Sequence, residues 1–102
     1  MDVQLLYFDG CPNHTEALDN LQRLLTEAGW QGAVEQVNVA STEAAERLEF
    51  RGSPTVLLDG VDPFLDPNAP VGLSCRVYRS DEGFQGTPPV ADLRNAIWHH
   101  LD

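Results

Sequence analysis

A short, almost continuously apolar run near the start of the chain, VQLLYF at residues 3–8, most constrains the fold. It is ended by Asp9-Gly10, and a run of this length with such an ending is typical of a strand buried on both faces. We therefore expect residues 3–8 to form the central strand of a sheet.

The segment that follows predicts a helix and a second strand. Pro12 suits the first position of a helix, because its missing N–H costs nothing there, and apolar residues then recur at helical spacing as far as Gly29. Residues 33–39, AVEQVNV, alternate as a strand does. A helix of this length can be the crossover of a right-handed βαβ unit, so we expect the first two strands to be parallel.

The rest of the chain predicts two more helices and two more strands. Ser41 or Thr42 can cap a second helix. The apolar run TVLL at 55–58 indicates a third strand, and RVYR at 76–79 indicates a short fourth one. A final helix with an apolar stripe follows Pro88-Pro89. The expected order of elements is βαβαββα.

Length and charge limit the class of protein and its partners. A chain of 102 residues predicts one domain, residues 1–102, with a core that needs neither disulfides nor a structural metal. Sixteen acidic residues against six basic ones give a net charge of −10, which repels phosphate backbones, so no nucleic-acid partner is expected. No apolar run approaches the roughly 18–20 residues of a membrane span, and no signal peptide is recognisable. We expect a cytoplasmic protein without a membrane partner.

The two cysteines, Cys11 and Cys75, are too few for a closed zinc site and are not spaced as metal ligands. The aspartates between residues 59 and 66 do not match a calcium loop. We therefore expect no metal and no cofactor. In the cytoplasm both thiols should be reduced, and a disulfide would be transient.

Two segments together resemble the thioredoxin-like family, over about residues 3–101. They are the Gly-Cys-Pro turn into the first helix and GSPTVLLDG ahead of a hairpin and a closing helix. The resemblance implies one thioredoxin-like domain of the α/β class, with a mixed four-stranded sheet and helices on both faces. It also implies that Cys11 is the active-site cysteine and that Pro54, between Ser53 and Thr55, is the facing cis-proline. More narrowly, YFDGCPN and GLSCRVYR resemble small bacterial thioredoxin-family proteins, some of them labelled by similarity to alkylmercury lyases.

The sequence departs from that family at His14, which stands where the family has its second cysteine. A dithiol cycle within this CPNH motif is therefore impossible. A cysteine in the first turn of a helix lies near unpaired N–H groups and the positive end of the helix dipole, which favour the thiolate. We expect Cys11 to be an exposed thiolate, with an inert thiol as the alternative.

His14 and Cys75 each have two interpretations. His14 can share a face with Cys11 and assist a leaving thiol, or it can be a solvated surface residue. Cys75 is the possible resolving thiol, but as the start of the fourth strand it should lie at the far end of the sheet from Cys11, unless the long connection at 60–74 folds back. Otherwise Cys75 is a small buried residue.

The resulting hypothesis is a monothiol thioredoxin-like protein that performs thiol–disulfide exchange or thiol transfer. Cys11 is its nucleophile, His14 and Pro54 complete the site, and a small thiol or a thiol-bearing protein resolves the mixed disulfide. Substrate binding is assigned to Pro12, Asn13, Ser53 and Thr55, with strand-like pairing at the backbone around Pro54. The alternative is a binding module that holds a soft metal, an organomercurial or a protein partner through Cys11, with or without Cys75. A third possibility is a scaffold without thiol chemistry.

Overall fold

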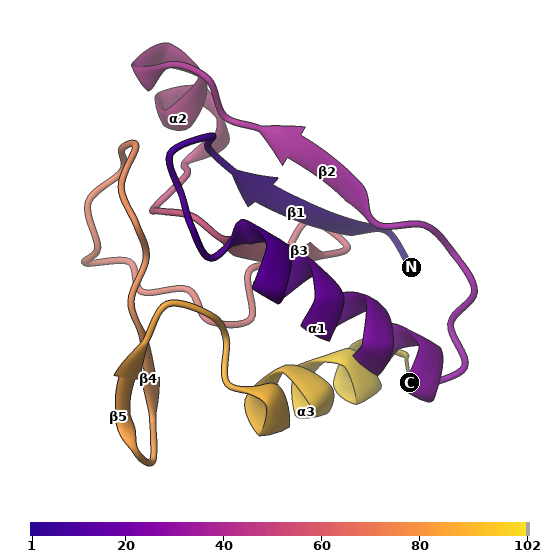
Figure 1. Ribbon diagram of the computed structural model, residues 1–102. Coiled ribbons are helices and arrows are strands. Elements are labelled where there is room, and N and C mark those ends of the chain that lie inside the picture. The colour runs from indigo at the N-terminus through magenta and orange to yellow at the C-terminus, as the bar shows by residue number, and fades with distance from the viewer. Residues whose placement is uncertain (102) are drawn as a thin grey trace.

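A three-stranded mixed sheet in the order β2-β1-β3 forms the centre of the protein in the computed structural model, which describes residues 1–101 (Figure 1). The strands are β1 (Val3–Tyr7), β2 (Glu35–Asn38) and β3 (Thr55–Leu58). β1 pairs in parallel with β2 and antiparallel with β3. The central position of the first strand and its parallel pairing with the second are thus confirmed. Asp102, the last residue of the expected domain, lies outside the described residues.

Helices cover both faces of this sheet, as expected. α1 (His14–Glu27) and α3 (Val90–Leu101) pack side by side on one face, and α2 (Thr42–Leu48) lies on the other (Figure 1). Neighbouring strand residues point to opposite faces, so Leu5 joins the core under α1 and α3 while Leu6 joins the core under α2. Ser41 caps α2 through a bond from the Ala44 N–H to its hydroxyl, 3.1 Å long.

The expected fourth strand is not part of the central sheet, and this part of the prediction was wrong. β4 (Tyr78–Ser80) instead pairs antiparallel with β5 (Gly83–Gln85), a strand that the sequence did not predict. Gly83, with a φ of 115°, completes the tight turn between them, a conformation that favours glycine. The backbone of β4 therefore forms its ladder hydrogen bonds with β5 and not with the central sheet. The described residues form a three-stranded sheet and a separate hairpin.

The first helix also begins later than expected, at His14 and not at Pro12. The Cys11 N–H bonds to the Phe8 carbonyl at 3.1 Å and closes a turn after β1. Asn13 is the N-cap residue, and its carbonyl accepts the Ala17 N–H at 3.1 Å. Cys11 therefore lies in the turn ahead of the helix and not in its first turn.

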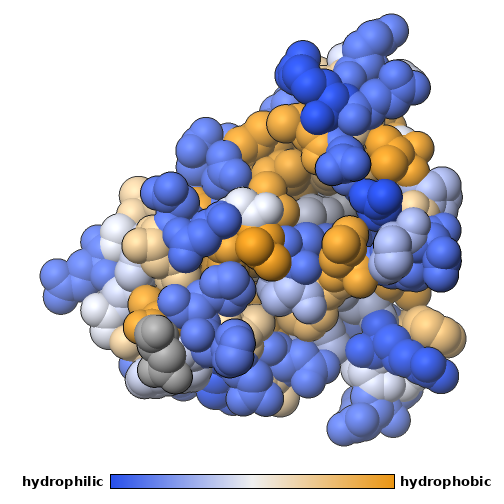
Figure 2. Space-filling model, turned by 180° about the vertical axis from the view of Figure 1, so that it is seen from behind, coloured by the Kyte–Doolittle hydropathy of each residue, from blue (hydrophilic) through white to orange (hydrophobic). Residues whose placement is uncertain are grey.

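The surface is mostly hydrophilic, with apolar side chains gathered in the middle of the back view (Figure 2). Several of the exposed large apolar residues belong to the connection between β3 and β4: Val61, Leu65, Val71, Leu73 and Val77. Within residues 1–101, no helix has both the length and the apolarity to cross a membrane.

Candidate functional site

Cys11 is buried, with only 8% of its surface exposed, so the expectation of an exposed thiolate was wrong. Its thiol donates a hydrogen bond to the Ser53 carbonyl, with 3.6 Å between the sulfur and the oxygen. The turn after β1 directs Cys11 inward, toward the chain that enters β3. This contact places the thiol of the CPNH motif next to the residue that precedes Pro54.

The Ser53-Pro54 peptide bond is cis, as the family resemblance implied. Thr55, the first residue of β3, donates its hydroxyl to the Gly52 carbonyl at 2.7 Å and so fixes the turn around Pro54. The Tyr78 hydroxyl donates to the Pro54 carbonyl. The Ser53 hydroxyl, in contrast, is buried and has no hydrogen-bond partner within residues 1–101.

A second extended segment, residues 74–76, pairs with Ser53. The Ser53 N–H donates to the Ser74 carbonyl and the Arg76 N–H donates to the Ser53 carbonyl, both at 2.8 Å, which makes Ser53 and Cys75 partners in a parallel bridge. Gly52 permits this approach, because a Cβ atom there would lie 3.0 Å from the Cβ of Arg76. The backbone groups of Ser53 that were expected to bind an extended partner are therefore occupied by the chain itself.

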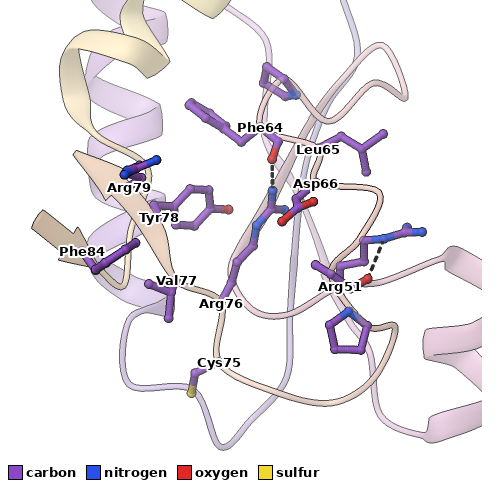
Figure 3. Close-up of a pocket in the computed structure, with 13 residues that line it drawn as sticks. Arg51, Phe64, Leu65, Asp66, Cys75, Arg76, Val77, Tyr78, Arg79 and Phe84 are labelled. Atoms are coloured by element: carbon purple, nitrogen blue, oxygen red, sulfur yellow. Dashed lines mark hydrogen bonds between the residues drawn. The ribbon is translucent and has the colours of Figure 1, made fainter. Parts of the chain in front are cut away.

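Cys75 is exposed and interacts with Cys11. The pKa of the Cys75 thiol is raised above its usual value by desolvation first, and then by the charge of Cys11 and a side-chain hydrogen bond with it. The expectation that Cys75 lies at the far end of the sheet was wrong, because the connection after β3 folds back. In Figure 3 the Cys75 sulfur points toward the faint indigo chain that joins β1 to α1.

An ion pair holds the folded-back connection in place. The Arg76 guanidinium lies 2.7 Å from the Asp62 carboxylate, and both side chains are nearly buried, at 9% and 11% exposure. Arg76 also donates to the Thr55 hydroxyl at 3.1 Å and to the Phe64 carbonyl. Sequence reasoning missed this pair. The one available signal was a charged residue at the start of an expected strand.

His14 is engaged away from the two thiols. Its ring stacks on Tyr7 with 3.7 Å between centroids, and its Nε2 atom is 3.0 Å from Gln36 Oε1 on β2. Within residues 1–101 no hydrogen bond joins His14 to Cys11. Neither interpretation of His14 matches this geometry, since the ring neither bonds the thiol nor is simply solvated.

The residues assigned to substrate binding are only partly accessible. Pro12 is exposed and Asn13 half-buried, whereas Ser53 and Thr55 are buried. Asn13 lies directly against Gly86, where a Cβ atom would come within 2.1 Å of its amide nitrogen. The chain after β5 therefore covers part of the CPNH turn.

A pocket of about 660 Å³ lies beside Cys75 (Figure 3). Three of the six arginines of the chain line it, Arg51, Arg76 and Arg79, in a protein of net charge −10. Phe64, Tyr78 and Phe84 supply aromatic walls. Cys75 is also one of the lining residues, although its sulfur points away from the other lining side chains in Figure 3.

Within residues 1–101, no three or more His, Cys, Asp or Glu side chains gather as a metal site. Comparisons with protein-family models, curated proteins and solved structures found no match. The site is therefore described from its own geometry: two thiols, one buried and one exposed, from two segments that both contact Ser53.

Proposed function

We propose that this chain is a thioredoxin-like thiol–disulfide exchange protein in which Cys11 and Cys75 form the redox pair. The observation that carries the proposal is the meeting of the two cysteines at Ser53. The Cys11 sulfur lies 3.6 Å from the Ser53 carbonyl oxygen, and Cys75 is the bridge partner of the same residue. The interaction of the two thiols, which contributes to the raised pKa of Cys75, supports their proximity.

The fold supports the thioredoxin-like assignment in three respects. The sheet order β2-β1-β3 combines a parallel βαβ unit with an antiparallel third strand. Cys11 precedes the first long helix, and Pro54 precedes β3. The assignment departs from the expected four-stranded sheet in the separate β4–β5 hairpin. Fold alone is a weak guide to function, so the proposal depends on the thiol pair.

The proposed reaction is a two-electron exchange with a partner disulfide. A thiolate of the pair attacks one sulfur of the partner and forms a mixed disulfide, and the first partner thiolate leaves. The other protein thiolate then attacks the protein sulfur of that mixed disulfide. The products are the Cys11–Cys75 disulfide and two partner thiols, and the reverse reaction oxidises partner thiols. The partner class is a small thiol or a thiol-bearing protein.

One thiol of the pair attacks and the other resolves, so the position of Cys75 next to Cys11 makes an external resolving thiol unnecessary. The monothiol hypothesis assigned that role to a separate molecule because Cys75 was expected far away. His14 receives no proton-transfer role in the proposal, since its ring is held by Tyr7 and Gln36.

The test is equilibration of the protein with reduced and oxidised glutathione, followed by alkylation of free thiols and peptide mapping. We expect a monomer with no free thiol and a Cys11–Cys75 crosslink. Cys11→Ser should retain a mixed disulfide with glutathione at the exposed Cys75, because no second thiol can displace it. Two thiols that stay free in the folded wild-type protein, or crosslinks only between chains, would contradict the proposal.

The second candidate function is capture of a soft metal ion, and the neighbouring sulfurs favour it. Paired thiolates are the ligands that Cu(I) and mercury prefer. Reduced wild-type protein titrated with Cu(I) should then bind one equivalent, and both Cys11→Ser and Cys75→Ser should lose it. Equal binding in the wild type and in both variants would exclude the thiol pair as the ligand set.

A further inference from the structure

The two thiols of the pair differ in how a partner can reach them. Cys11 is 8% exposed, and its sulfur is directed at the Ser53 carbonyl. Cys75 is exposed and is the bridge partner of Ser53. A reagent arriving from solvent therefore meets the Cys75 side chain first.

The strand-like route to Cys11 is also occupied. An extended partner that paired with Ser53 would need its N–H and its carbonyl, and these already bond to Ser74 and Arg76 at 2.8 Å. Segment 74–76 lies where such a partner strand would pair, and it is held there by the Arg76–Asp62 ion pair. A partner cannot pair with Ser53 unless it first displaces this segment.

Building on the proposed redox pair, we propose that partner thiols enter the reaction at Cys75, and that Cys11 is the internal, leaving sulfur. In the oxidised protein an incoming thiolate attacks the Cys75 sulfur, the Cys11–Cys75 bond breaks, and Cys11 leaves as a thiolate. A second partner thiolate attacks the partner sulfur of the mixed disulfide and releases Cys75. The partner loses two electrons as its disulfide forms, and the protein gains them. A low-molecular-weight disulfide such as oxidised glutathione regenerates the oxidised protein.

The ionisation of Cys75 agrees with this direction of attack. Its pKa is raised by desolvation and by Cys11, so at neutral pH the free Cys75 thiol is protonated and attacks slowly. A thiol with a raised pKa leaves more slowly than an ordinary thiol, so departure of Cys75 from the disulfide is slowed. Exposure and this slow departure both favour attack on the Cys75 sulfur.

The wild-type protein provides the direct test. Oxidised protein is mixed with reduced glutathione, the reaction is stopped by alkylation within the first turnover, and the glutathionylated peptide is identified by mass. We expect glutathione on Cys75 and the alkylating group on Cys11. Glutathione on Cys11 would overturn the entry role of Cys75 and leave the proposed redox pair intact. Failure of the oxidised disulfide to form would overturn both.

A matched pair of variants gives a rate for each sulfur. Cys11→Ser and Cys75→Ser are charged with thionitrobenzoate, and its release by glutathione is followed by the visible absorbance of the free thionitrobenzoate. Release from Cys75 in Cys11→Ser should be at least about tenfold faster than release from Cys11 in Cys75→Ser. A folded Cys75→Ser that does not take the label also supports the proposal. Equal or reversed rates would contradict it.

Discussion

The Tyr78 hydroxyl donates a hydrogen bond to the carbonyl of Pro54 and so connects the β4–β5 hairpin to the turn that enters β3. Burial raises the pKa of Tyr78 well above its usual value, so the hydroxyl remains a protonated donor. The Arg76 guanidinium lies 4.7 Å from the centre of the Tyr78 ring, and the Phe64 ring packs edge to face against the Tyr78 ring. Tyr78 therefore joins three segments around the thiol pair.

Tyr78→Phe tests the contribution of this hydrogen bond. The substitution keeps the ring but leaves the buried Pro54 carbonyl without its donor, so we expect the free energy of unfolding to fall by about 1–3 kcal/mol. Urea denaturation measures the change. Tyr7→Phe is the matched control, since no hydrogen bond to the Tyr7 hydroxyl is described in residues 1–101, and it should cost less than about 0.5 kcal/mol. Equal losses in the two variants would argue against a structural role for the bond.

The raised pKa of Tyr78 predicts a loss of stability at alkaline pH. The usual pKa of 10.0 applies in the unfolded chain and the folded value is higher, so the folded protein keeps its proton where the unfolded one loses it. The stabilisation is complete below pH 10 and declines as pH rises above it. Urea denaturation of the wild type between about pH 8 and pH 11.5 should show this decline.

Lysine does not contribute to this alkaline transition, because the chain has none. Tyr78→Phe should therefore flatten the decline, apart from the part due to Cys75, whose pKa is also raised. Measuring Tyr78→Phe in a protein that also carries Cys75→Ser removes the contribution of Cys75 to the decline. A decline equally steep in the double variant would show that another group controls it.

The Arg76–Asp62 ion pair should contribute far more to stability than the exposed pair between Arg94 and Glu27. Asp62→Asn leaves a nearly buried guanidinium without its counter-charge, and we expect a loss of about 3 kcal/mol. Glu27→Gln breaks a bridge of the same 2.7 Å length whose side chains are 42% and 47% exposed, and it should cost less than about 1 kcal/mol. Urea denaturation compares them, and similar losses would contradict the importance of burial.

Asp62→Asn should also affect the thiol pair, because Arg76 adjoins Cys75 and holds segment 74–76 against Ser53. We expect the Cys11–Cys75 disulfide to form more slowly in this variant, by about tenfold, as effective concentration falls with a looser segment. Glu27→Gln again serves as the control, with unchanged kinetics. Unchanged kinetics in both variants would show that the ion pair does not position Cys75.

Local sequence patterns predicted the elements that pack against the central sheet. The bounds of β3 agree with the expected residues 55–58, and Ser41 caps α2 as expected, because apolar periodicity and capping act over a few residues. The predicted place of the fourth strand in the central sheet was wrong because its pairing depends on contacts between distant residues. Its partner was decided by the turn at Gly83 and by the bonds of Arg76 to a distant segment, which no local pattern records.

The sequence identified residues of the candidate site, but it did not predict how they are arranged. The resemblance indicated Cys11 and the cis bond before Pro54, and the structure places them together. The burial of Cys11 and the approach of Cys75 depend on how the connection at 60–74 folds. The Arg76–Asp62 ion pair and the absence of a side chain at Gly52 support that path, and no local sequence pattern identifies the partner of either residue.

Ser53→Ala tests the one buried side-chain group at the site that lacks a partner within the described residues. Its hydroxyl makes no hydrogen bond there, so its removal should leave the free energy of unfolding unchanged or raise it by up to about 1 kcal/mol. Thr55→Val is the control, since the Thr55 hydroxyl bonds both Gly52 and Arg76, and it should cost about 1–3 kcal/mol. Urea denaturation measures both. A clear loss in Ser53→Ala would mean that this hydroxyl is bonded in solution, and the neighbouring thiols would then be the first partners to examine.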